Sequence, residues 1–191
     1  MTFSATQFKT NLEQGGARPS LFSVELLFPS QINNVPTKLS KFFVKGATIP
    51  ASTVGAYDVY YNGKAVKVAG DRTYDTWETT IINDEDFQIR IALEQWMDLI
   101  SDHRLNIRRK LNKSEGENAS YKQRLKLTQY TKSGEEAWHY HFLGAFPTAL
   151  STIALDWGTV SEIEEYTCTW TYDRWMPGTS GHLLVSDSHA N

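Results

Sequence analysis

VAGDRTYDTWETTIINDE, residues 68–85, governs the interpretation of the chain because three different patterns meet in it. Gly70, Asp71, Arg72 and Thr73 are typical of a charged turn, and an alternating run and an acidic corner follow them. An Asp–Arg pair can serve an active site or a structural corner. General acid–base catalysis needs further titratable groups within reach, and no histidine or second carboxylate lies at a spacing that indicates one. We therefore expect these four residues to form a structural or assembly corner.

The hydrophobic period changes after the strand expected at residues 74–82. Apolar residues then recur at the spacing of one helix face: Ile89, Leu93, Trp96, Met97 and Ile100. This pattern predicts one α-helix at about 85–101, the only long helix of the chain. Asn83 or Asp84 is placed to cap it, and the acidic residues 85 and 86 would lie in its first turn, where negative charge is favourable.

Residues 57–68, YDVYYNGKAVKV, give the clearest local signal in the chain. Asn62-Gly63 separates two β-rich runs and suits the two positive φ angles of a type I′ turn, so the stretch predicts a β-hairpin. The arm is long and only partly apolar. We therefore expect it to project from a sheet rather than to lie in the core.

Other alternating or β-rich runs predict further strands at residues 21–28, 41–47, 121–131, 137–146, 152–157 and 164–175. In the last of these runs Tyr166, Cys168, Trp170 and Tyr172 share one side, and Pro177-Gly178 is expected to end it. About eight or nine strands and one helix predict a mainly β fold. The expected architecture is a β-sandwich or barrel of two packed antiparallel sheets with one flanking α-helix.

The chain is predicted to hold one β-domain between two appendages. Residues 1–20 are polar and are expected to form an N-terminal arm, residues 21–176 the β-domain, and residues 177–191 a flexible C-terminal tail. The N-terminus lacks an apolar run of signal-peptide length, and no stretch approaches the ~20 apolar residues of a membrane span.

Composition excludes several classes of protein. The 191 residues carry a net charge of -3, so the basic footprint of a nucleic-acid binder is missing. Aromatic residues make up 13% of the chain, which suits a strand-rich folded protein. The single cysteine, Cys168, cannot form a disulfide within the chain and is expected to be a buried small hydrophobe rather than a nucleophile.

Two clusters of titratable residues need separate interpretation. His139 and His141 point the same way on a strand and could chelate a metal, but no third ligand is specified, so a half-solvated strand face is the preferred interpretation. Residues 104–126 hold eight basic and two acidic residues. They are interpreted as a solvated loop or as a complement to acidic runs on a neighbour, in preference to a DNA-binding site. No motif for a cofactor or a catalytic metal is present, and neither is predicted.

Three ordered stretches resemble the tail tube proteins of contractile-tailed bacteriophages. They are ARPSLFSVEL (17–26), VAGDRTYDTWETTIINDE (68–85) and LDWGTVSEIEEYTCTWTYDRW (155–175). The resemblance implies a structural virion protein that is not an enzyme. Six copies would form a ring, and rings would stack into a hollow tube inside a contractile sheath, through which viral DNA passes.

The same resemblance implies the partners and the location. The expected partners are other copies of the chain, the sheath protein, the tube-initiating baseplate proteins, and the tape-measure protein and DNA in the lumen, without sequence specificity and without a membrane. The expected location is the phage tail, after assembly in the host cytoplasm. The hairpin residues Tyr57, Tyr61, Asn62, Gly63 and Lys64 are then expected to contact a neighbouring subunit.

Three other functions stay open at this point. A tube-initiating baseplate protein and the inner tube of a phage-like contractile injection system would share the fold. A soluble β-sandwich binding module would use its aromatic face. A tube lumen must release its cargo, so we expect its lining to be neutral or acidic.

Overall fold

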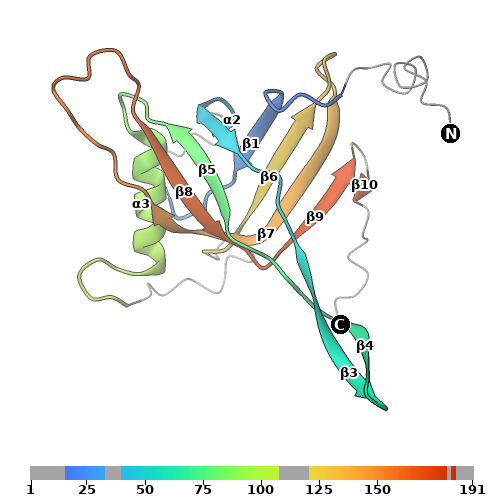
Figure 1. Cartoon of the computed structure of the whole chain (residues 1–191). Helices are drawn as coiled ribbons and strands as arrows, with labels where there is room; N and C mark the ends of the chain where they lie inside the picture. Colours follow the sequence, from blue (N-terminus) through green and yellow to red (C-terminus); the bar gives the residue numbers. More distant parts are fainter. Residues whose placement is uncertain (1–15, 33–39, 108–120, 180–181, 184–191) are drawn as a thin grey trace.

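The computed structural model describes residues 16–32, 40–107, 121–179 and 182–183 of the chain (Figure 1). The predicted N-terminal arm and C-terminal tail lie mostly outside these residues. In chain order the elements are β1 (Phe22–Leu26), α2 (Ser40–Phe43), β2 (Val44–Ala47), β3 (Thr53–Tyr61), β4 (Lys64–Thr73), β5 (Trp77–Ile82), α3 (Gln88–Ile100), β6 (Gln123–Tyr130), β7 (Glu136–Leu150), β8 (Glu165–Thr171), β9 (Arg174–Thr179) and β10 (His182–Leu183).

The strands form two antiparallel layers that share the long strand β7. Layer A contains β1, β6, the first half of β7, β9 and β10, and layer B contains the second half of β7, β8, β5 and β2. The prediction of a mainly β fold with two antiparallel sheets and one flanking helix is confirmed.

β7 turns from one layer into the other at a bulge around Gly144. The pairing register of β6 with β7 changes between Gln123 and Leu125. At this point two residues of β7, Leu143 and Gly144, face one residue of β6. Gly144 has φ 66°, a left-handed conformation that favours glycine, and a Cβ there would come within 2.8 Å of Cγ of Asp173. The bulge keeps both Phe142 and Ala145 fully buried on the inner face.

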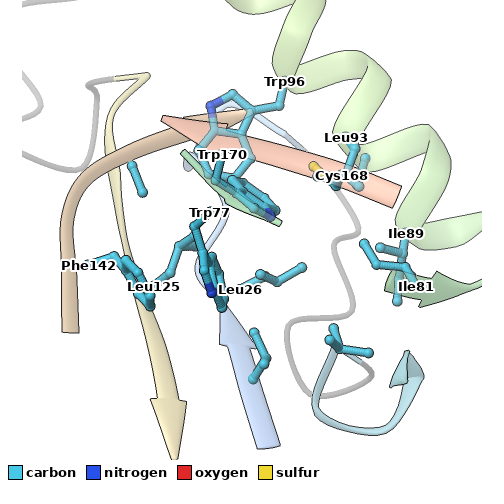
Figure 2. Close-up of a cluster of buried hydrophobic side chains, with 14 of the residues drawn as sticks. Leu26, Trp77, Ile81, Ile89, Leu93, Trp96, Leu125, Phe142, Cys168 and Trp170 are labelled. Carbon is cyan, nitrogen blue, oxygen red and sulfur yellow. The ribbon is translucent and has the colours of Figure 1, made fainter. Parts of the chain in front are cut away.

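The core lies between the inner faces of the two layers (Figure 2). Trp77 of layer B stacks on Phe142 of layer A, with ring centroids 4.2 Å apart. Each buried indole N–H has an acceptor, as such groups usually require. The Nε1 of Trp77 donates to the carbonyl of Thr48 at 2.7 Å, and that of Trp170 donates to Oγ1 of Thr79 at 3.0 Å.

Helix α3 covers the side of the core next to β5 and β8. In the predicted apolar stripe Ile89, Leu93 and Trp96 are buried, as expected, whereas Met97 and Ile100 are only half-buried. Trp96 meets Trp170 edge-on at 5.6 Å, and its Nε1 donates to the carbonyl of Tyr121 at 2.7 Å.

The helix begins three residues later than predicted. Phe87 has a left-handed conformation (φ 52°), so residues 85 and 86 precede the helix and do not lie in its first turn. The N-cap is Phe87 and not Asn83 or Asp84 as predicted, although Oδ1 of Asp84 still accepts the backbone N–H of Gln88, the first helical residue, at 3.1 Å.

Three other predicted elements differ from the structure. The run at 41–47 begins as the one-turn helix α2 and becomes strand β2 only at Val44. Residues 152–157 are a loop. The run at 164–175 is two strands, because the chain leaves β8 after Thr171 and returns as β9, which continues through Pro177 and Gly178 to pair with β7. Proline is tolerated there because β9 lies near the edge of the sheet.

Candidate assembly surfaces

The predicted hairpin is present and forms a two-stranded sheet of its own, apart from both layers (Figure 1). Asn62 (φ 49°) and Gly63 (φ 76°) both have the positive φ that a type I′ turn requires, so the predicted turn is confirmed. β3 and β4 pair from Tyr61↔Lys64 down to Thr53↔Thr73, with one irregularity near Gly55.

One face of the hairpin is apolar and uncovered. By the register, five side chains share this face, which we call the hairpin stripe: Tyr57, Val59, Tyr61, Val66 and Val68. Their exposed fractions run from 37% for Val68 to 76% for Tyr61. Lys64 lies at the tip of the same face, and the opposite face carries the Lys67–Asp58 ion pair.

The root of the hairpin is held by aromatic side chains of the core. Trp175 donates its Nε1 to the carbonyl of Ala51 at 3.1 Å, just before β3 begins. Tyr74, just after β4 ends, packs against Tyr172 and Trp175 with ring centroids 6.1 and 6.3 Å away. The arm therefore leaves the layers from a fixed base.

Residues 70–73 are not the turn that the sequence predicts. They are the last residues of β4, and the chain turns only afterwards, at residues 74–76. Gly70 lies where the two hairpin strands approach closely, since a Cβ there would be 3.3 Å from the carbonyl oxygen of Gly55. Asp71, Arg72 and Thr73 are exposed. A role of these residues in assembly stays a prediction.

The β7–β8 loop, residues 151–164, is a second uncovered apolar surface. Leu155, Trp157, Val160 and Ile163 are 80%, 102%, 91% and 69% exposed. Asp156 shapes the turn that presents Trp157, because its Oδ1 accepts the N–H of Gly158 at 2.9 Å and its carbonyl accepts that of Thr159 at 3.2 Å. Sequence reasoning missed this surface, although its Asp-Trp-Gly turn is a visible signal.

The free edge of β1 is closed by a single side chain of α2. Oγ of Ser40 accepts the backbone N–H of Leu26 at 3.1 Å and lies 3.5 Å from the carbonyl oxygen of Val24. Ser40 is fully buried. A capped edge cannot add a further strand at that point, which protects the monomer from uncontrolled pairing.

The two histidines of β7 lie side by side on the outer face of layer A, 4.9 Å apart between ring centroids. His139 is buried, so the predicted half-solvated face is wrong at that position. Burial and the nearby Lys126 lower the pKa of His139, and burial, His139 and the cations of β6 lower that of His141 to about 4. Among the residues that the structure describes, no group of three possible ligands completes a metal site here.

Two of the four described cations of the basic segment pair within the chain. Lys122 contacts Asp173 at 2.7 Å, and Lys126 contacts Glu136 at 3.2 Å. Residues 108–120 lie outside the described residues. Cys168 is fully buried, and burial raises its pKa, which keeps the thiol protonated and matches the predicted hydrophobic role. Among the helices in the described ranges, none has the length and apolar character needed to cross a membrane.

A family profile described as "Phage tail tube protein" matches residues 17–177, which include α3, the hairpin and both layers except the end of β9 and β10. The chain belongs to the phage tail tube protein family. The predicted resemblance is therefore confirmed, and the protein is a structural component of a phage tail.

Individual relatives agree with this family. The chain is 29% identical to the tail tube protein gp19 of Enterobacteria phage T4 over 160 residues, which cover 83% of the chain and 90% of that protein. Identity to the corresponding protein of Enterobacteria phage T6 is 28% over the same length.

Solved structures share the fold at lower identity. The tube-terminating cap of the anti-feeding prophage superposes with a TM-score of 0.61 at 15% identity, covering 86% of this chain and 92% of that one. The sheath–tube complex of an extracellular contractile injection system, PVC, gives a TM-score of 0.56 at 16% identity, covering 94% of this chain and all of the other. These likenesses concern the fold alone.

Proposed function

We propose that six copies of this chain form a ring, and that rings stack into the hollow inner tube of a contractile phage tail. The tube conducts viral DNA during ejection and has no enzymatic role. Its partners are the surrounding sheath protein, the baseplate proteins that start the tube, and the tape-measure protein and DNA in the lumen, which are held without sequence specificity.

One observation carries the assembly part of the proposal. A two-stranded hairpin alone in water is marginally stable, yet β3 and β4 extend away from both layers with every residue exposed except the half-buried Gly70. A second copy of the chain that covers the hairpin stripe would remove this liability. Tyr57, Tyr61 and Lys64 would then be contact residues, with Asn62-Gly63 setting the shape of the tip.

The electrostatics of layer B suit a conduit. Its outer face carries a row of hydroxyl side chains that includes Thr80, Thr167 and Thr169. The cation Lys45 is paired with Glu165. A face without unpaired cations would not retain the phosphates of passing DNA.

The test is a hairpin shortened without loss of its turn. Deleting residues 58–61 and 64–67 removes four facing pairs and leaves Tyr57 and Val68 flanking Asn62-Gly63, in the register that they already have. We expect an unchanged melting temperature, because the hairpin contributes nothing to the core, and no tubes by negative-stain electron microscopy. Normal tubes from this variant would contradict the proposal.

A tube-terminating or tube-initiating role is the second candidate, because the same fold occurs in the anti-feeding prophage cap. Titration of the purified protein separates the two functions. A tube subunit forms filaments that lengthen with concentration, whereas a cap or initiator stops at single rings.

A further inference from the structure

Two uncovered apolar surfaces lie at opposite ends of the molecule. In Figure 1 the β7–β8 loop projects at the upper left, in orange, and the hairpin projects at the lower right, in teal. We propose that the β7–β8 loop of one copy is the docking site for the hairpin stripe of a second copy. The inference rests on the proposed tube function and goes beyond it by naming the surface that receives the hairpin.

The exposure of the loop is too concentrated to be ordinary surface. Single exposed apolar residues are common, but contiguous exposed apolar patches mark interaction sites. Four large apolar side chains lie between residues 155 and 163, and Trp157 is completely exposed. Tryptophan is the residue type most enriched among those that dominate binding energy at protein interfaces.

The loop is also held in shape before any partner arrives. The turn at Asp156 fixes the backbone on both sides of Trp157. At the far end of the loop, Asn83 donates to Glu164 at 2.8 Å through its side chain and at 2.8 Å through its backbone N–H. A surface that is already ordered loses less conformational entropy on binding.

The charges around the two surfaces are complementary. Residues 155–164 hold Asp156, Glu162 and Glu164 and no lysine or arginine, whereas Lys64 lies at the hairpin tip on the face of the stripe. Within the described chain, neither Glu162 nor Lys64 forms an ion pair. Opposite charges beside apolar patches fix the register of a contact and speed its formation.

The positions of the two surfaces require the contact to join different copies. A contact between unlike surfaces on two identical chains is heterologous, and each chain that docks leaves a free surface of each kind for the next. Repetition of that contact builds a ring or a filament. The hairpin and the loop are therefore a matched donor and acceptor for open-ended growth.

The first test is Trp157→Ala, with Phe42→Ala as its matched control. Both side chains are highly exposed aromatics, 102% and 79%, and Phe42 belongs to α2, which lies apart from the loop and the hairpin in Figure 1. We expect Trp157→Ala to keep the wild-type melting temperature and to raise the critical concentration for tube formation at least tenfold. Phe42→Ala should assemble like the wild type. Normal tube assembly by the Trp157→Ala variant would overturn the inference. This holds even if the tubes of the variant no longer bind the sheath protein.

A second test reads the contact itself and does not depend on tube formation. Copies with Lys64→Cys, which places the thiol on the face of the hairpin stripe, and copies with Ser161→Cys are mixed and treated with a short bis-maleimide; the native Cys168 is buried and does not interfere. We expect cross-linked pairs from this mixture and none from Lys64→Cys mixed with Ser133→Cys, which places the thiol on the exposed β6–β7 turn. If the wild-type protein forms tubes but the Lys64–Ser161 cross-link is absent, the docking site is refuted and the tube function stands. A cross-link without tubes would support the docking site and count against the tube function.

Charge reversal gives the third readout. Lys64→Glu and Glu162→Lys should each weaken assembly, and the double variant should recover most of it. Single variants that assemble normally, or a double variant worse than both singles, would contradict this pairing.

Discussion

At the scale of single residues, we expect His139 and His141 to make folding depend on pH. They share the outer face of layer A with Lys126 and Arg124 of β6 and with Glu25 of β1. The Nδ1 atoms of both rings are buried without a hydrogen-bond partner; Oε2 of Glu136 lies 3.9 Å from Nδ1 of His139, but burial and Lys126 outweigh it and the pKa of His139 is lowered. This environment favours neutral rings, so protonation opposes the folded state.

The stability of the protein should therefore fall in mild acid. The pKa of His141 is lowered from about 6.5 to about 4. Between these values the unfolded chain binds a proton that the folded chain does not, so stability is complete above pH 6.5 and decreases as the pH falls toward 4. Between pH 7 and pH 4.5 we expect the His141→Gln variant to lose about 1–2 kcal/mol less unfolding free energy than the wild type. The expected difference is smaller than the full pKa shift would give, because the ring is partly exposed. Urea unfolding of the wild type and the variant at pH 7 and pH 4.5 measures this difference. Equal losses of unfolding free energy in the two proteins would refute the prediction.

At Arg72 the prediction from sequence was wrong about local structure. The Gly-Asp-Arg-Thr sequence resembles a turn, and local preference alone gives that prediction. In the structure, pairing with residues 53 and 54 across the hairpin extends β4 through Thr73 and leaves Arg72 exposed. The pairing partner lies some twenty residues earlier in the chain, so a pattern read locally does not contain it.

At the scale of elements, Gly144 controls how β7 enters both layers. Any other residue there must adopt a left-handed backbone and displace Asp173, which also pairs with Lys122. We expect Gly144→Ala to cost about 2–4 kcal/mol of unfolding free energy, in the range of substitutions that strain the backbone and crowd packed groups. Chemical denaturation measures the change.

Gly134→Ala is the matched control for this change. Gly134 also has a left-handed conformation (φ 84°), but nothing lies within 4 Å of the position of its Cβ. Its substitution should cost only about 1 kcal/mol. Equal costs at the two positions would mean that the bulge tolerates a side chain.

Elements with strong local signals were predicted well, and elements set by distant contacts were not. The hairpin, α3 and the inward residues of β8 follow from turn chemistry or hydrophobic period within a few residues. The division of residues 164–175 into β8 and β9 depends on β7, which pairs with both. The exposure of Trp157 was missed because an apolar run such as TIALDW predicts burial in a strand, and only the fold reveals that nothing covers it.

At the scale of the whole molecule, a chain with only one working end should act as a terminator. The shortened-hairpin variant keeps the β7–β8 loop but lacks Val59, Tyr61 and Val66 of the hairpin stripe, so it can receive a hairpin from a neighbour but docks its own hairpin poorly. Added to wild-type protein, it should shorten tubes in proportion to its fraction, as measured by electron microscopy. Phe42→Ala added in equal amounts should leave tube length unchanged. If added shortened-hairpin variant leaves tube length unchanged, the proposed contact between the hairpin of one copy and the loop of the next is contradicted.

The passage of β7 through both layers has a mechanical consequence. In a sandwich whose layers touch only through side chains, packing alone resists a shearing force. The layers can then slide past each other by small displacements. Here one strand runs from layer A into layer B, and a force on either layer passes into the other along peptide bonds. A tube wall built from such subunits should deform as a single shell, with its compliance concentrated at the bulge around Gly144.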